Sequence, residues 1–120
     1  MAEFINVSIS EDTITISFDA GSPEIMTLGR KMNDICEEAY MNGYNWAAFV
    51  EYYLKENRPD ILNNIESDPE AETYYALING ADSEANGLAH EFTKILEQLL
   101  SDEEATLTFL EDNMDNIEWE

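Results

Sequence analysis

The chain has 120 residues, which is enough for one sizeable hydrophobic core, and we expect residues 1–120 to form a single domain. Its 27 acidic residues face five basic ones, so the formal net charge of -22 excludes nucleic acid as a partner and predicts a basic one. No apolar run reaches the roughly 18 residues of a membrane span and no basic, apolar leader opens the chain, so we expect an unexported cytoplasmic protein without membrane contact.

Two segments near the N-terminus alternate apolar and polar residues and are rich in β-branched side chains, namely Phe4 to Ile9 and Thr13 to Phe18. The intervening "SED" is typical of a turn, so the pattern predicts a β-hairpin. The apolar residues of the second segment share one face: Ile14, Ile16 and Phe18. In the first segment Phe4 and Val7 fall on opposite faces, which predicts a strand that starts later or contains a bulge.

Two helices are predicted after the hairpin. Ser22 and Pro23 are typical of a helix start, and apolar residues at helical spacing continue to Ala39. Asn42-Gly43 is predicted to end this helix, because glycine accepts the left-handed conformation of a C-terminal cap. Asn45 is then predicted to cap a second helix that ends before Pro59.

The second helix has an apolar stripe that we predict to pack in the core rather than to form a pocket. Its members are Trp46, Phe49, Val50, Tyr53 and Leu54. Tyr44 and Tyr52 fall off the stripe, so they are the better candidates for exposed contacts.

Residues 70–78 are ambiguous between helix and strand. The run "TYYALI" stands between Asp-Pro and Asn-Gly turn signals, which favours a strand. A long helix is predicted from Asp82 or Ser83 to about Leu100, and Ser101 with Glu104 predicts a capping box for a last helix. This order predicts an α+β fold, with a small antiparallel sheet (the N-terminal hairpin plus a later strand) packed by about four helices on one face.

No residue pattern indicates catalysis, a cofactor or a metal site. The single cysteine, Cys36, and the single histidine, His90, both lie on predicted helices without a catalytic partner nearby in the sequence. The stretch from Asp82 to Gly87 matches four positions of a calcium-binding EF-hand loop, but Thr93 occupies the position of the essential bidentate carboxylate. We therefore expect a helix start there, and a protein that is not an enzyme.

Acidic residues gather in groups on the predicted first and last helices, and we predict that these groups bind a partner. They are Asp34, Glu37 and Glu38 on the first helix, and Glu103, Glu104, Glu111, Asp112 and Asp115 on or near the last. Like charges in adjoining helical turns repel by about 0.2–0.5 kcal/mol per pair, and a basic partner would turn that cost into electrostatic steering. The alternative interpretation of any one group is an ordinary solvated helix face.

The stretch "MNGYNWAAFVEYYLKENRPDIL", followed by "SDPEAETYYALI" and "ADSEANGLAHEFTKILEQLLSDEE", resembles the fifty-first immunity family of bacterial polymorphic toxin systems. The resemblance covers roughly residues 32–115. Its motif residues are Asn42, Gly43, Tyr44 and Trp46, then Asp68, Pro69, Glu70 and Ala71. Glu72 replaces the glycine that usually follows in the family, which leaves the start of that strand open.

The resemblance implies an antidote that binds and blocks the C-terminal toxin domain of a cognate effector. We expect a monomer or weak dimer. It implies structural roles for Asn42, Gly43, Trp46, Asp68 and Pro69 rather than contacts with the toxin. Together with the charge, it favours a basic toxin such as a nuclease. Two alternatives remain open: a DNA mimic that inhibits nucleic-acid-binding proteins, and an acidic domain without a basic partner.

Overall fold

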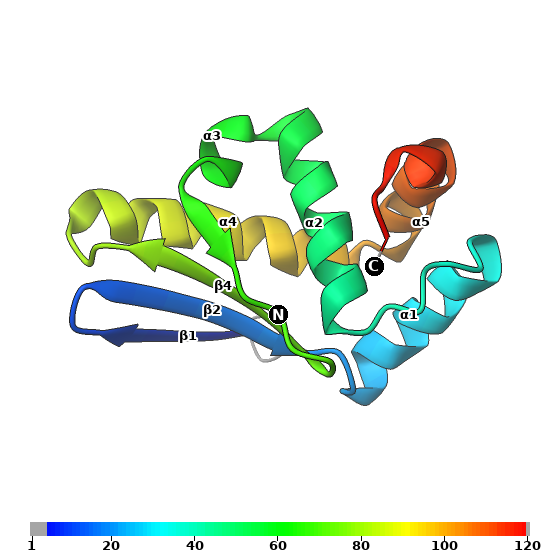
Figure 1. Cartoon of the computed structure of the whole chain (residues 1–120), viewed down its shortest axis with the longest axis horizontal. Helices are drawn as coiled ribbons and strands as arrows, with labels where there is room; N and C mark the ends of the chain where they lie inside the picture. The colour runs from blue at the N-terminus through cyan, green and yellow to red at the C-terminus, as the bar shows by residue number, and fades with distance from the viewer. Residues whose placement is uncertain (1–4, 120) are drawn as a thin grey trace.

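The computed structural model describes residues 5–119, and its elements are drawn in Figure 1. Four strands form one antiparallel sheet in the order β1-β2-β4-β3. The strands are β1 (Ile5–Ser10), β2 (Thr13–Asp19), β3 (Ile65–Ser67) and β4 (Thr73–Asn79). The helices are α1 (Pro23–Ile35), α2 (Gly43–Asn57), α3 (Pro59–Leu62), α4 (Ser83–Ser101) and α5 (Glu103–Asn113), followed by the 3-10 helix η2 (Met114–Asn116). The predicted α+β class is therefore confirmed.

The N-terminal hairpin forms with an uninterrupted register. Ile5 lies opposite Phe18 and Ser10 lies opposite Thr13, with no extra residue between them, so the bulge is wrong for Ile5–Ser10. Phe4 falls outside the described residues. The tight turn includes Glu11 in a left-handed conformation with φ of 53°.

One face of the sheet is packed by helices and the other is open. Alternate residues of the two central strands point toward the helices and are at most 2% exposed: Ile14, Ile16, Phe18, Tyr74, Ala76 and Ile78. Figure 1 shows α2 and α4 lying over this face. Trp46 and Phe49 of α2 are buried there, and Trp46 meets Phe18 edge-on at a centroid distance of 5.4 Å. The predicted core role of these aromatic residues is confirmed.

The boundary between α1 and α2 differs from the prediction. α1 ends at Ile35, and the chain turns at Met41, whose φ is 54°, so Asn42-Gly43 does not cap α1. Asn42 instead caps α2, because its Oδ1 accepts a hydrogen bond from the Asn45 backbone N–H at 2.9 Å. Asn45, the predicted cap, lies inside the helix and is buried.

Gly43 is required by a close approach of two backbones rather than by its φ angle. Its N–H donates to the carbonyl of Ala71 at 2.9 Å. A β-carbon at Gly43 would overlap the carbonyl oxygen of Glu70 and lie 2.6 Å from that of Thr73. The "NGYNW" and "DPEA" motifs, far apart in the sequence, therefore meet at this point.

Further differences concern caps and short elements. Ser101 is the last residue of α4, and Asp102 rather than Ser101 caps α5, since its Oδ1 accepts from the Ala105 N–H at 3.3 Å. The ambiguous segment is a strand, as favoured, and it starts at Thr73. The short elements α3 and β3 were not predicted. The long helix α4 is confirmed, and of the two predicted starts Ser83 is its first residue and Asp82 its cap.

Two glycine substitutions test the close approach. We expect Gly43→Ala to lower the free energy of unfolding by about 2 kcal/mol or more, because the new methyl group forces α2 away from the turn before β4. Gly87→Ala is the matched control, since it lies in α4 with no atom within 4 Å of a β-carbon. We expect Gly87→Ala to raise the free energy of unfolding by at most about 1 kcal/mol, because alanine favours the helix more than glycine does. Urea unfolding followed by tryptophan fluorescence measures both, and equal stability of the two variants would contradict the contact.

Tyr74 predicts a specific loss of stability at alkaline pH. Burial raises the pKa of its hydroxyl, and the charge of Glu51 adds to the shift while a side-chain interaction with Ser67 opposes it. Because the folded pKa lies above the unfolded one, this contribution to stability is complete below about pH 10 and is lost as the pH rises further. Tyr74→Phe should remove this part of the dependence, which is at most about 1.4 kcal/mol per pH unit. Unfolding curves of the unchanged protein and of Tyr74→Phe, measured from about pH 8 to about pH 11, test this. If both lose stability in parallel, Tyr74 is not the source of the alkaline loss.

Candidate functional site

The eight acidic residues predicted to bind a partner are all exposed, and we call them together the α1–α5 acidic surface. They are Asp34, Glu37, Glu38, Glu103, Glu104, Glu111, Asp112 and Asp115. Glu37 and Glu38 were predicted on the first helix, but they follow its last residue, Ile35. The remaining members lie on α1, α5 and η2.

The fold brings the two halves of this surface together, because α1 packs against α5. Lys31 Nζ and Glu103 Oε2 form an ion pair at 2.7 Å between exposed side chains of the two helices. Asp34 lies three residues beyond Lys31 and hence on the same side of α1. The first turn of α5 therefore lies beside the last turns of α1.

Helix dipoles distinguish among these carboxylates. Glu103 and Glu104 stand in the first turn of α5, where negative charge is favourable. Asp34 lies in the last turn of α1, and Glu111 and Asp112 lie in the last turn of α5. Neither of these turns contains a basic residue. Each such carboxylate opposes the helix dipole at a cost of about 0.3–1 kcal/mol. Asp34, Glu111 and Asp112 therefore lack the local structural explanation that Glu103 and Glu104 have.

The helix that presents most of this surface is held firmly against the core. Thr106 is buried, and its Oγ1 donates to the carbonyl of Leu99 at 2.6 Å, which links α5 to the last turn of α4. Phe109 packs its ring against Phe49 at 5.8 Å and against Tyr53 at 5.0 Å between centroids. The carboxylates of α5 are thus displayed from a rigid element.

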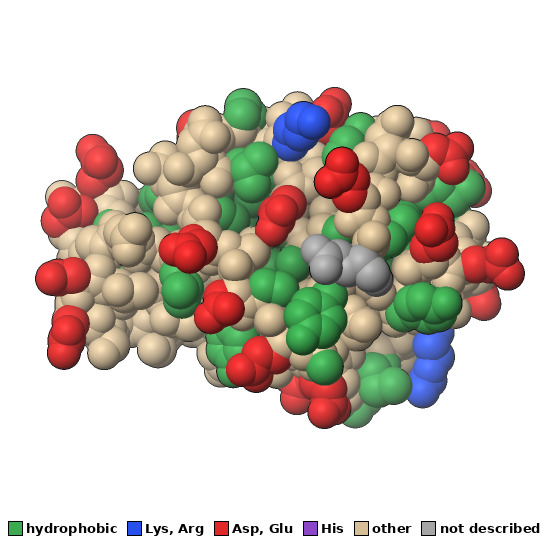
Figure 2. All heavy atoms as spheres, in the orientation of Figure 1, with side chains coloured by type: hydrophobic (Ala, Val, Ile, Leu, Met, Phe, Trp, Pro, Cys, Tyr) green, Lys and Arg blue, Asp and Glu red, His purple; other side chains and the backbone are tan. Residues whose placement is uncertain are grey.

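Acidic side chains are also spread over much of the rest of the surface, as Figure 2 shows. Some of them have structural partners. The Arg58 guanidinium contacts Asp60 at 3.0 Å and Glu91 at 2.7 Å, and it holds the pKa of Asp60 below its usual value through their hydrogen bond. The hydrogen bonds to Asp60 and Glu91 in turn raise the pKa of Arg58. This exposed network connects α3 to α4.

Two of the carboxylates beside a hollow at α4 have structural partners. A hollow of about 630 Å³ lies between α4 and the β3–β4 pair, but two of its carboxylates have structural roles: Asp82 caps α4 and Glu91 binds Arg58. Asp82 Oδ1 accepts from the Ala85 N–H at 2.9 Å, so the EF-hand-like stretch is a helix start as predicted. Within residues 5–119, no group of three or more acidic, histidine or cysteine side chains is placed to hold a metal ion.

A second hollow, which the sequence did not indicate, lies between α1 and the start of α2 and has a volume of about 520 Å³. Two of its lining residues are exposed apolar side chains, Met26 and Tyr40. Of the predicted exposed contacts, Tyr44 is exposed, whereas Tyr52 is half-buried and its hydroxyl donates to Asn113 at 3.3 Å. Among the described helices, none is both long and apolar enough to cross a bilayer.

The family model described as Immunity protein 51 matches residues 10–115, and thus extends from the end of β1 to η2. No curated protein and no solved structure matches the chain.

The contact that holds α5 can be tested with two substitutions at Thr106. Thr106→Val keeps the volume but leaves the buried Leu99 carbonyl without its partner, so we expect a loss of about 1–3 kcal/mol in the free energy of unfolding. Thr106→Ser keeps the hydroxyl and loses only a methyl group, so it should cost about 1 kcal/mol. Chemical denaturation of the two variants gives the comparison. If valine is tolerated as well as serine, the hydrogen bond does not hold α5.

Proposed function

The chain belongs to the Immunity protein 51 family, and on that basis we propose that it binds and neutralises a cognate toxin domain of basic character, with a nuclease as the favoured case. Membership of the family supports an antitoxin role and suggests an inhibitor rather than an enzyme. The effector is the product of a polymorphic or contact-dependent toxin system, and its C-terminal domain is the partner. Inhibition takes place in the cytoplasm, where a nuclease would meet its substrate.

The acidic surface is the observation that supports a basic partner. The chain has a formal net charge of -22, and three carboxylates of the α1–α5 acidic surface stand at helix ends where they cost stability. Such a cost is offset when a cationic surface approaches, because opposite fields raise association rates and favour the complex. A toxin that binds the phosphates of nucleic acid presents that kind of cationic surface. An acidic inhibitor can occupy this surface, and the release of counterions then favours binding as it does for nucleic acid.

The first experiment is calorimetric titration of the protein with an inactivated variant of the toxin domain encoded next to it. We expect nanomolar or tighter binding at about 50 mM NaCl that weakens by tenfold or more at about 500 mM, because salt screens the exposed charges. The absence of heat at both salt concentrations, with both proteins folded, would falsify the proposed function. Equal binding to several unrelated basic proteins would instead support the DNA mimic.

Charge reversal locates the electrostatic contact. We expect Glu111→Lys with Asp112→Lys to weaken toxin binding by about tenfold or more, mainly through slower association. The matched control reverses the same two residue types, Glu11→Lys with Asp12→Lys, in the β1–β2 turn, and we expect an effect of less than about threefold. Kinetic binding measurements on both pairs decide the point. Equal losses would mean that net charge rather than the α1–α5 acidic surface governs the encounter.

A further inference from the structure

The groove between α1 and the start of α2 has the composition of a contact surface. Its walls come from α1, from the segment that joins α1 to α2, and from the turn before β4, with Met26, Arg30, Asp34, Tyr40, Met41 and Glu72 among its lining residues. Tyr40 is 72% exposed and Met26 is 39% exposed. Tyrosine, methionine and arginine are the side chains that protein interfaces favour over the rest of a protein surface.

Two exposed apolar side chains border this groove. Five large apolar residues are exposed among those that the structure describes: Val7, Ile9, Met26, Tyr40 and Tyr44. Two of them, Met26 and Tyr40, line the groove, whereas Tyr44 lines a separate hollow beside Tyr52 of α2. Figure 2 shows hydrophobic side chains among acidic ones over the region of α1 and the start of α2. In a chain this acidic, an apolar cluster of this kind points to a partner.

The backbone turns Tyr40 outward at some cost. Met41 adopts a left-handed conformation with φ of 54°, which is unfavourable for a residue with a β-carbon, and its side chain is only 4% exposed. Gly29 of α1 makes room for it, since a β-carbon at Gly29 would lie 3.1 Å from Met41 Cβ. Met41 thus fills the space beneath the groove while the neighbouring Tyr40 stands in solvent.

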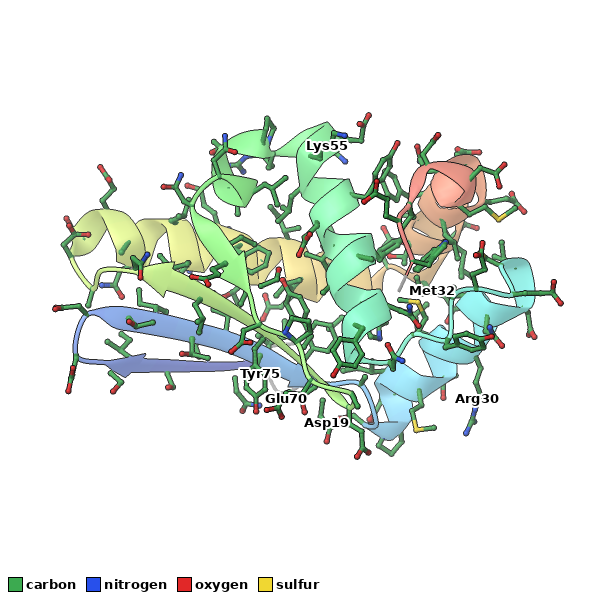
Figure 3. All side chains as sticks on the ribbon, viewed as in Figure 1. Asp19, Arg30, Met32, Lys55, Glu70 and Tyr75 are labelled. Carbon is green, nitrogen blue, oxygen red and sulfur yellow. The ribbon has the colours of Figure 1, made fainter. Side chains whose placement is uncertain are left out.

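Charge around the groove is mostly negative, with one exception. Asp34 and Glu72 line it, and Glu37 and Glu38 lie in the same connecting segment as Tyr40. Arg30 is the exception: it forms no ion pair with any residue in the described part of the chain, and Figure 3 shows it extending away from α1. An apolar centre with a charged rim is the usual arrangement of a protein–protein interface.

We propose that the toxin domain docks in this groove, with Tyr40 and Met26 as the apolar contacts and the acidic rim facing basic residues of the toxin. Arg30 pairs with a carboxylate of the toxin and fixes the orientation of the complex. The proposal rests on the proposed function and names its contact surface. Asp34 belongs both to the groove and to the α1–α5 acidic surface, so the two adjoin at this residue.

The other exposed apolar pair, Val7 and Ile9, does not share these features. Both residues lie on the edge strand β1, and their chain neighbours Asn6, Ser8 and Ser10 are uncharged. The carboxylates that follow it along the chain, Glu11 and Asp12, lie in the turn at one end of the strand, whereas Asp34 and Glu72 line the groove itself. The edge strand provides a matched control, because the same loss of exposed apolar surface can be made there.

The test measures affinity for the inactivated toxin domain encoded next to the protein, with the full chain and its variants. We expect the double variant Met26→Ala with Tyr40→Ala to bind at least about 30-fold more weakly than the unchanged protein. The control, Val7→Ala with Ile9→Ala, should stay within about threefold. Thermal unfolding verifies that all variants fold, which the exposure of these side chains leads us to expect.

A single arginine separates docking from general electrostatics. Arg30→Ala makes the protein more acidic, so attraction between net charges alone predicts tighter binding to a basic toxin. If Arg30 pairs with a toxin carboxylate, the substitution instead weakens binding by about tenfold. Lys94→Ala is the control, because it makes the same change in charge at an exposed position on α4. We expect it not to weaken toxin binding.

The outcomes separate the groove from the function. If the unchanged protein binds and the groove variants bind as tightly, the groove is not the contact surface, although the antitoxin role stands. A larger loss from the β1 pair than from the groove pair overturns the proposal in favour of the sheet edge. If the unchanged protein does not bind at all, the proposed function fails and the groove proposal fails with it.

Discussion

The arrangement of the molecule depends on one close approach between two backbones. The start of α2 touches the turn before β4, where Gly43 donates to Ala71 and leaves no room for a side chain. This contact sets the height and angle of α2 over the sheet, and so places Trp46 against Phe18 at the centre of the core. The connection from α1 must also reach this point, which forces the tight turn at Met41 and shapes the groove above it.

Much of the fold could be predicted because its signals are local and periodic. The alternation in β2 and the aromatic stripe of α2 each identify one buried face, and the capping residue Asp82 marks the start of α4. Asn42-Gly43 was assigned to the wrong helix end because a glycine required by a neighbouring backbone looks, in sequence, like a glycine required by its φ angle. Ser101 and Asp102 are both good capping residues, and tertiary packing of Thr106 on Leu99 selects between the possible starts. A strand as short as β3 has too few residues to show a period.

The sequence predicts the acidic character of the candidate surface but does not indicate the groove beside it. Composition alone indicates an acidic surface, but only the packing of α1 against α5 reveals that the acidic start of α5 lies beside the end of α1. Helix ends then distinguish Asp34, Glu111 and Asp112 from carboxylates that stabilise the structure. The sequence does not indicate the groove because the first helix was predicted to extend to Asn42-Gly43, a range that includes Tyr40. The chain is irregular there, and the Tyr40 side chain is exposed to solvent.

The open edge of β1 has a consequence for the behaviour of the protein in solution. An edge strand with apolar side chains such as Val7 and Ile9 is a template for pairing between copies, and natural sheets protect such edges. Here the protection is long-range repulsion between copies that each have a formal net charge of -22. The net charge falls toward zero as the pH approaches the sequence pI of about 4.1, so we expect this repulsion to be lost in mild acid. The charge that we propose to attract a basic partner thus also opposes association between copies of the free protein.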